Sequence, residues 1–541
     1  MNPFDFRTLP FLRITIPAVA GVVLGDVFDF PWGWLAIAFA ATLAVAWAMK
    51  RTGWSSPYVW VAVCLLYMLL STWARPSTAL PHGQRVVATA VVLEDPFAEG
   101  RWGRCDARVT AFRLYDPGNP GAGFPDTASA DSIPANANAP AAPAGASSGN
   151  SLSSSDPSPW RSVSEKITLS VDTSYRVLAG DRIAFEGYFD AMGDGGYGRL
   201  MARRGFTARS YLTPGNLLYA VAPEGFSPRR LLAGIKKGAS ARLSRLGFGP
   251  DEEQIVQAMV LGSREVLSRQ MRDDYARSGT THILAVSGLH VAIVFLLINA
   301  LLWFVPLFRR GHIAKNVIAV AAIWFYSLLT GMSPSVVRSA FMFTGVQLAL
   351  AASARSQPLN TLLATAAVML AISPNTLWDV SFQLSFAAVL FIMLWYTPLY
   401  RLVRTRWGAV NFISGAVLIS VVATVGTAPL VAWQFGYFSV SGIVVNPVVT
   451  NLSYIILILP LVWIMAPLHF LTPVIRWPVE WAVQLQNYMA HWGAVQKWGV
   501  VHVSPSPFWL AATYAIFLLV TPLVARLGEV RERKNKAGFP V

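Results

Sequence analysis

The sequence predicts a polytopic α-helical membrane protein with a small β-barrel domain inserted outside the membrane. Of its 541 residues, 54% are hydrophobic and 13% are charged, whereas a soluble domain carries about 25% charged residues. Apolar runs long enough to cross a bilayer form two groups, separated by a segment without such runs. This pattern excludes an ordinary soluble enzyme. The two cysteines, Cys64 and Cys105, are too few for a disulfide framework or a cysteine-based zinc site.

Residues 1–79 are predicted to form an N-terminal membrane segment with three spans. The apolar runs cover residues 9–27, 32–49 and 58–73, each near the ~20 residues that a transmembrane helix needs. Lys50 and Arg51 lie between the second and third runs, and the positive-inside rule assigns that turn to the cytoplasm. The N-terminus is therefore expected inside, and the chain leaves the third span on the outer side.

Residues 80–222 are expected to form a separate domain outside the membrane. Alternating apolar residues, typical of half-buried strands, favour a small antiparallel barrel. They lie at residues 84–93, 104–114, 166–171 and 181–189. An insertion at residues 116–160 is rich in Ala, Pro, Ser, Gly and Asn and contains no Lys or Arg. Such a composition buries too little apolar surface to fold, so the insertion is predicted to be disordered.

A basic amphipathic helix is predicted at residues 223–250. Cations recur there among leucine and isoleucine residues, a pattern typical of helices that lie on a membrane surface. The cations include Arg229, Arg230, Lys236 and Lys237. Charge alone does not distinguish contact with lipid phosphates from contact with a nucleic acid backbone.

A second membrane domain is expected over residues 251–526, followed by a basic cytoplasmic tail at residues 527–541. The predicted spans lie at residues 283–304, 313–329, 336–352, 359–371, 378–395, 412–431, 443–465 and 508–525. Basic loops agree with the outer placement of the barrel, but an even number of spans would leave the tail outside. Either residues 474–503 also cross, or one helix is re-entrant. We favour a re-entrant or broken helix at residues 442–451, where NPVVTN interrupts the apolar run.

Polar residues inside apolar segments are the candidates for function, because each costs free energy unless it faces a polar interior. The string HILAVSGLHVAIV contains His282, Ser287, Gly288 and His290. The two histidines would lie about 12 Å apart along a helix, so a metal would need other ligands. Small residues such as Ser287 and Gly288 also permit close helix packing, and both interpretations stay open.

Two further strings carry polar groups near the predicted outer ends of their spans. TGMSPSVVRSAFMF contains Ser335 and Arg338, and DVSFQLSFAAVLF contains Asp379 and Gln383. Arg338 either reaches lipid headgroups or lines a water-filled passage and contacts an anion. Asp379 is expected at the same depth, where it could pair with Arg338.

A fourth string, TAPLVAWQFGYFSVSGIVVNPVVTN, contains Asn446 among prolines and glycines. It predicts an interrupted helix pair. Membranes tolerate such irregular backbone only where it lines a cavity.

Together these strings resemble the ComEC-type competence proteins, which pass DNA across the cytoplasmic membrane during natural transformation. The resemblance rests on LAVSGLHV at 284–291, TGxxxSxxR at 330–338, DxSFQLSF at 379–386, and the TAP, FxxxS and N-P elements between 427 and 447. The barrel domain, with LAGDRIAFEGYF and MARRGFTARSYL, also looks like the OB-type barrel of that family. The predicted fold class is thus a polytopic α-helical membrane protein with an inserted extracytoplasmic OB-type β-barrel domain.

The resemblance implies a channel for single-stranded DNA, not an enzyme, with no cofactor and no metal. The implied DNA path comprises His282, Ser287, Gly288, His290, Ser335, Arg338, Asp379, Gln383 and Asn446. The implied outer contacts are Arg199, Arg203, Arg204, Arg209, Arg229, Arg230, Lys236 and Lys237. Expected partners are single-stranded DNA, membrane lipid, an extracytoplasmic DNA receptor and a cytoplasmic ATP-driven motor. A separate nuclease and a homo-oligomer are left open.

Many members of the family also carry a metallo-β-lactamase-like domain. The H-x-H-x-D-H string is absent from this sequence, so we expect a short form without that domain and without nuclease activity. The G-x-x-x-x-G-K-[ST] loop that binds ATP phosphates is absent as well. Energy for movement is therefore expected from another protein.

Two other functional classes are compatible with the same residues. A membrane transporter of another anionic substrate would use the broken helices and Arg338, and saturable uptake of such a solute would favour it. A membrane-embedded enzyme would use His282, His290 and Asp379 as acid–base or metal groups, and a bound metal would favour that class.

Overall fold

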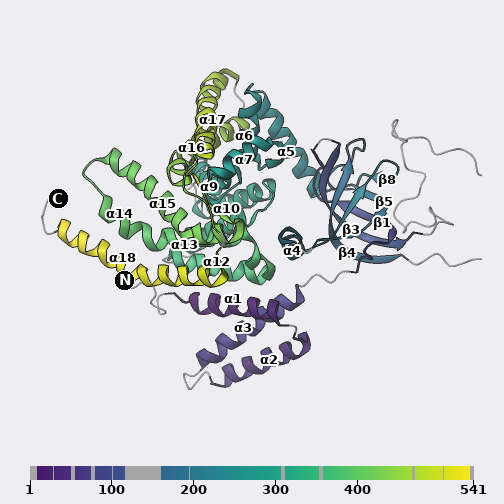
Figure 1. The fold of residues 1–541 in the computed structure, drawn as a ribbon, viewed down its shortest axis with the longest axis horizontal. Helices are drawn as coiled ribbons and strands as arrows, with labels where there is room; N and C mark the ends of the chain where they lie inside the picture. Colours follow the sequence, from purple (N-terminus) through teal and green to yellow (C-terminus); the bar gives the residue numbers. More distant parts are fainter. Residues whose placement is uncertain are drawn as a thin grey trace, which may run out of the picture. The chain divides into compact units, whose positions relative to one another are not determined.

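The computed structural model describes residues 9–28, 30–49, 55–74, 79–99, 101–115, 160–193, 195–223, 225–305, 311–351, 357–465, 469–503 and 505–536. The chain divides into two compact units, one of Met1–Ala74 with Lys236–Val541 and one of Arg75–Ile235. The first is the helical unit and the second is the sheet unit (Figure 1).

The helical unit begins with three apolar helices that match the predicted N-terminal spans. They are α1 (Leu12–Val27), α2 (Trp32–Ala48) and α3 (Ser55–Trp73). Glycines let α1 approach the backbone of α3: a Cβ on Gly25 would lie 2.9 Å from the carbonyl oxygen of Met68. Small residues at such positions let two helix backbones pack closely against each other.

The later helices follow the predicted second domain with one break. They are α10 (Gly311–Leu329), α11 (Pro334–Ala351), α12 (Pro358–Ile372), α13 (Val380–Phe391), α14 (Thr397–Val403), α15 (Gly408–Phe435), α16 (Gly442–Met465), α17 (Thr472–Val495) and α18 (Pro507–Lys536). The span expected at residues 283–304 is wrong at its start, because the short helix α8 (Thr281–Leu284) ends there and α9 (Gly288–Leu301) begins only at Gly288. The predicted basic tail begins as the end of α18, and residues 537–541 lie outside the described part.

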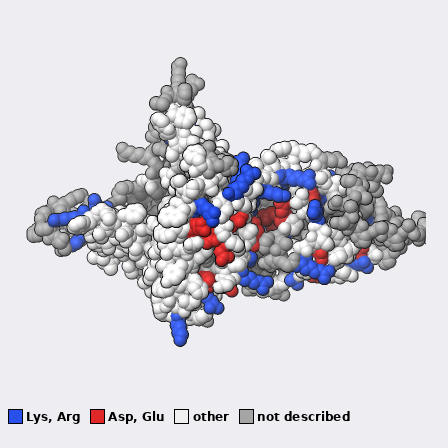
Figure 2. Space-filling model, turned by 90° about the horizontal axis from the view of Figure 1, so that it is seen from above, with Lys and Arg blue, Asp and Glu red and all other residues white. Residues whose placement is uncertain are grey.

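Four of the described helices are long and apolar enough to cross a membrane. They span Val380–Val403, Gly408–Phe435, Gly442–Met465 and Pro507–Arg531. The first joins α13 to α14 through a π-helical turn at Ile392–Tyr396, where Pro398 lacks the N–H group that a regular helix needs. Wide areas of the surface carry no charge (Figure 2). The chain is therefore a membrane protein.

The re-entrant or broken helix expected at residues 442–451 is also wrong. α16 runs without a break from Gly442 through Asn446 to Met465. The interruption comes earlier, where Gly436 ends α15 in the left-handed conformation with φ +74°, which only glycine adopts without strain. Between the two helices, β9 (Tyr437–Ser439) pairs with β10 (Val500–His502).

The other predicted crossing, residues 474–503, is largely α17. Polar side chains attach α17 to α6 (Pro250–Leu261) and α7 (Arg269–Arg277). Gln484 donates to Glu252 at 3.0 Å, and His491 lies 3.0 Å from Asp274. α17 is long enough to span, but its many polar residues keep it out of the described helices that are apolar enough to cross a membrane.

The sheet unit contains one eight-stranded sheet. Its strands are β1 (Arg85–Val92), β2 (Phe97–Glu99), β3 (Trp102–Leu114), β4 (Arg161–Asp172), β5 (Arg182–Tyr188), β6 (Asp190–Ala191), β7 (Phe206–Leu212) and β8 (Leu217–Val221). Hydrogen bonds join them in the order β6-β7-β4-β3-β1-β5-β8, with β2 on β3. The four predicted strands are confirmed as β1, β3, β4 and β5. The hydrogen-bonded order is open, so no closed barrel is present in the described residues.

Alternation of side chains builds the core of this sheet. On β4, Ile167 and Leu169 point inward and are fully buried, which leaves Lys166, Thr168 and Ser170 on the outer face. The predicted disordered insertion at 116–160 lies outside the described residues, apart from Trp160. That ring stacks beneath the guanidinium of Arg113 at 5.4 Å.

The predicted amphipathic helix is α5 (Pro228–Ser244). In its C-terminal half the apolar side packs against protein. Leu243 and, just beyond the helix, Leu246 are fully buried, and Trp463 Nε1 donates to Arg242 O at 3.1 Å. The expectation that this half lies with its apolar face in lipid is therefore wrong.

Candidate functional site

Three helices of the helical unit begin close together and gather polar side chains. α9, α11 and α13 start at Gly288, Pro334 and Val380. We define the N-terminal polar cluster as Ser287, Gly288, Ser335, Arg338, Ser339 and Ser385. Ser335 Oγ lies 3.1 Å from Ser385 Oγ, and Arg338 Nη1 donates to Ser385 O at 3.4 Å. The structure thus brings together four of the predicted path residues, Ser287, Gly288, Ser335 and Arg338.

The guanidinium of Arg338 is buried without a carboxylate partner. The residue is 5% exposed. Nη2 donates to Ser339 Oγ at 3.3 Å, and Cζ lies 5.8 Å from the centre of the Phe386 ring, but Nε has no hydrogen-bond partner. None of the ion pairs between described residues includes Arg338. A buried cation without an anion is costly in a membrane, so this side chain marks a place suited to negative charge.

Gly288 permits the close approach of α9 to α11. A Cβ on this residue would lie 2.6 Å from Ser339 Oγ and 2.8 Å from Arg338 Nη2. The first backbone N–H groups of α9 therefore lie beside the guanidinium. Since a helix N-terminus carries partial positive charge, the helix end and Arg338 both favour an anion in the same place.

Asp379 does not pair with Arg338, and that prediction is wrong. Its carboxylate caps α13 instead, where it accepts from the N–H of Ser381 at 2.8 Å. An aspartate at this position satisfies backbone donors that the helix itself leaves open. Gln383 donates to Leu377 O at 2.9 Å and accepts from Gln434 Nε2 at 3.4 Å, which connects α13 to α15.

Ser287 and His290 form a capping box at the start of α9. Ser287 Oγ accepts from Leu289 N–H at 3.3 Å, and His290 Nδ1 accepts from Ser287 N–H at 3.2 Å. Nε2 of His290 is buried without a partner, whereas His282 is exposed on α8. Within the described residues, no three His, Cys, Asp or Glu side chains are grouped as a metal site requires.

Asn446 has no hydrogen bond to the N-terminal polar cluster in the described structure. It is 7% exposed on α16, and its Oδ1 has no hydrogen-bond partner. A Cβ added to Gly442 would lie 3.3 Å from Asn446 Nδ2 and 3.1 Å from Ser278 O. Asn446 therefore belongs to a second buried polar region, where α16 meets the end of α7.

The predicted outer cations differ in their surroundings. Arg230 pairs with Asp181 at 3.0 Å, and Lys236 lies 3.5 Å from Glu265, so protein carboxylates partly neutralise both. The side chain of Arg199, on α4 (Gly196–Arg203), lies outside the described part. Exposed cations at the remaining positions are Arg203, Arg204, Arg209, Arg229 and Lys237.

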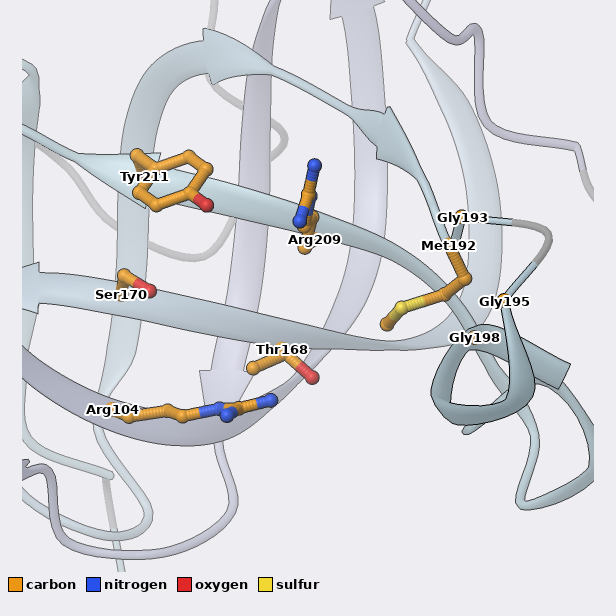
Figure 3. Close-up of a pocket in the computed structure, with 9 residues that line it drawn as sticks. All are labelled: Arg104, Thr168, Ser170, Met192, Gly193, Gly195, Gly198, Arg209 and Tyr211. Carbon is orange, nitrogen blue, oxygen red and sulfur yellow. The ribbon is translucent and has the colours of Figure 1, made fainter. Parts of the chain in front are cut away.

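Sequence reasoning missed a pocket on the outer face of the sheet unit. Figure 3 shows its side chains, which come from β3, β4, β7 and the segment after β6. The lining residues are Arg104, Thr168, Ser170, Met192, Gly193, Gly195, Gly198, Arg209 and Tyr211. Arg209 alone was among the predicted contacts. The alternation FTARSYL on β7, with Arg209 and Tyr211 on the same face, is the signal that would have found it.

The fold and the polar cluster define a membrane protein whose buried polar groups meet at helix N-termini. Residues 259–527 match the family described as "Competence protein". The chain belongs to this ComEC-type competence family, as the sequence strings indicate.

Two curated proteins are similar to parts of the chain. One is "ComE operon protein 3" of Bacillus subtilis (strain 168), 31% identical over 201 residues, which are 36% of this chain and 24% of that protein. The other is an "Uncharacterized protein" of Aquifex aeolicus (strain VF5), 32% identical over 193 residues, which are 36% of this chain and 42% of that protein. The matches thus span less than half the length of either relative. No solved structure is significantly similar to the chain.

Proposed function

We propose that this protein is a channel that passes a single strand of DNA across the cytoplasmic membrane during natural transformation. The observation that carries the proposal is the buried guanidinium of Arg338, which has no carboxylate partner and leaves Nε unpaired. Membership of the competence family supports DNA as the substrate.

The chemistry of the N-terminal polar cluster suits a DNA backbone. Each nucleotide of a strand carries one negative phosphate, so a path through the membrane needs positive charge that is not already neutralised. Arg338 and the N-terminus of α9 supply such charge next to each other. The hydroxyls of Ser335 and Ser385 supply hydrogen-bond partners that carry no charge.

The sheet unit is proposed to be an OB-type domain on the outer side. Two pairings support this topology: β4 pairs with β7 in parallel, and β6, one residue after β5, returns to pair with β7. In this arrangement the sheet unit meets incoming DNA, helped by an extracytoplasmic DNA receptor. A cytoplasmic ATP-driven motor supplies the energy.

A channel accounts for the polar residues better than a membrane-embedded enzyme does. His290 and Asp379, two of the three groups that such an enzyme would use, each cap the start of a helix. A capping carboxylate is held by its own backbone donors and is poorly placed for proton transfer. The protein is accordingly proposed to act without catalysing a reaction.

DNA entry in a transformable host that lacks its own competence channel tests the proposal. The chain should restore the conversion of labelled, cell-bound DNA into DNA that is protected from external nuclease. Arg338→Met should bind DNA at the cell surface but admit none, while Arg338→Lys, which keeps the charge but loses the planar fork, should admit a reduced amount. The exposed Arg404 provides the control, since Arg404→Met should behave as wild type.

Normal DNA entry with Arg338→Met would overturn the role of this residue. Failure of the wild-type chain to admit DNA, together with saturable uptake of a small anion, would replace the proposal with an anion transporter.

A further inference from the structure

The pocket on the sheet unit has the composition of a nucleotide site. We propose that it holds one nucleotide of a single DNA strand, with its phosphate between Arg104 and Arg209 and its base against the ring of Tyr211. The identity of the ligand as DNA rests on the proposed function. The binding site itself rests on the geometry that follows.

Strand register places the pocket side chains in two adjacent rows on the outer face. Arg104 of β3 lies opposite Ser170 of β4, which in turn lies opposite Tyr211 of β7. In the next row, Thr168 of β4 lies opposite Arg209 of β7. Two cations and an aromatic ring thus surround a floor formed by Thr168 and Ser170, and Met192 points in from the end opposite Tyr211 (Figure 3).

Arg209 remains able to bind a phosphate. Its Nε lies 3.8 Å from Asp190 Oδ2, and both side chains are about half exposed. An ion pair that long and that exposed contributes little free energy. A phosphate held by two guanidinium groups can therefore displace it, since arginine matches phosphate oxygens with two parallel hydrogen bonds.

Tyr211 offers a surface for stacking. The residue is 45% exposed, and the ring of Trp102 meets it edge to face, with ring centres 6.3 Å apart. This contact orients the tyrosine, so little conformational entropy is lost when a base stacks on it. The cavity of about 380 Å³ lies within the ~300–1,000 Å³ typical of small-ligand sites.

The arrangement favours a single strand over a duplex. Bases in a duplex already stack on one another and hide their faces, whereas an unpaired base can stack on an aromatic ring. Hydroxyls and arginines that contact the backbone do not distinguish one base from another. The pocket is therefore expected to prefer single strands without a strong preference for sequence.

Binding of a fluorescent oligothymidine to the detergent-solubilised full chain tests the proposal. Tyr211→Ala should weaken binding by about 5- to 150-fold, the range seen when a stacking ring is removed, and Tyr211→Phe should retain most of the affinity. Arg209→Ala should weaken binding and lower the slope of log Kd against log salt by about 0.7, the loss of one phosphate contact. Tyr188, 53% exposed on β5 and outside the pocket, supplies the control, because Tyr188→Ala should bind as wild type.

Wild-type binding by both Tyr211→Ala and Arg209→Ala would overturn the proposal, as would equal losses for Tyr188→Ala and Tyr211→Ala. Equal affinity of the wild-type chain for a duplex of the same length would overturn the stacking role. The assay involves no transport, and both pocket variants leave Arg338 unchanged. Failure of the pocket is thus distinguishable from failure of the channel, which is measured by DNA entry.

Discussion

Replacing Arg338 with methionine separates a structural role of the buried cation from a role in DNA passage. Methionine has a similar length and no charge, so Arg338→Met leaves no large cavity. The hydrogen bonds that disappear are long, at 3.3 and 3.4 Å. The two acceptor atoms are held in place by other groups. Ser339 Oγ still donates to Ser335 O at 3.0 Å, and Ser385 O belongs to the backbone of α13.

The balance of free energies favours methionine. Removing a guanidinium from water destabilises the folded state by several kcal/mol. A hydrogen bond from a charged donor stabilises it by about 1.5–3 kcal/mol at good geometry. The two bonds of Arg338 exceed the usual length range. We expect Arg338→Met to leave the free energy of unfolding unchanged or to raise it by about 1–4 kcal/mol, while DNA entry is lost. Thermal unfolding of the detergent-solubilised full chain measures the first effect.

Arg338→Ala is the matched variant. It removes the same charge but leaves a cavity, so it should lower the free energy of unfolding by about 2–5 kcal/mol. A loss of more than about 3 kcal/mol in Arg338→Met, the size expected when a needed buried partner is removed, would refute the reasoning. It would show that the guanidinium holds α9, α11 and α13 together.

Three further predictions concern single contacts. Gly288→Ala should lower the free energy of unfolding by about 1–3 kcal/mol through overpacking against Ser339 and Arg338; Gly238→Ala on α5, where a Cβ meets no atom within 4 Å, should instead be neutral or slightly stabilising in the same thermal unfolding assay. Ser287→Ala should cost about 0.5–2 kcal/mol by removing the cap of α9, seen as faster amide exchange in its first turn. Burial raises the pKa of Asp106 to about 6 from 3.8, and Glu94 adds to the rise. Ionisation of this carboxyl therefore lowers the free energy of unfolding of the sheet unit as pH rises through 6. Asp106→Asn should increase the amide protection of β3 by at most about 3 kcal/mol at pH 7.5 and should leave it unchanged below pH 4.

The positions of most helices follow from hydropathy, but the break between α8 and α9 does not. The apolar run of residues 283–304 continues on both sides of it. The break is encoded by Ser287 and His290, whose side chains cap the new helix. A histidine takes the place that glutamate or glutamine usually occupies in a capping box. The sequence Ser287 to His290 therefore does not match the usual capping-box pattern.

The pairing of Arg338 with Asp379 failed for a related reason. Equal depth in the membrane made the two residues plausible partners, but Asp379 directly precedes α13 and its carboxylate binds the backbone there. The carboxylate of Asp379 therefore forms a local hydrogen bond with the backbone of its own segment instead of an ion pair with Arg338 on another helix. On the sheet unit, β7 pairs in parallel with β4, and the paired residues lie more than 40 positions apart from Ile167 onward. The rows that place Arg209 beside Thr168 therefore follow only from the three-dimensional register.

The central claim is that a DNA strand crosses the membrane through the N-terminal polar cluster, and cross-linking of a strand stalled in transit tests it most directly. The full chain, with Cys64 and Cys105 replaced by serine, would carry either Ser335→Cys in the cluster or Leu296→Cys, a position on α9 that is 62% exposed. A strand with thiol-reactive bases and a bulky outer end would be offered to transforming cells. The account predicts a DNA adduct at Ser335→Cys and none at Leu296→Cys. DNA entry without an adduct at Ser335→Cys, or with equal adducts at both positions, would contradict it.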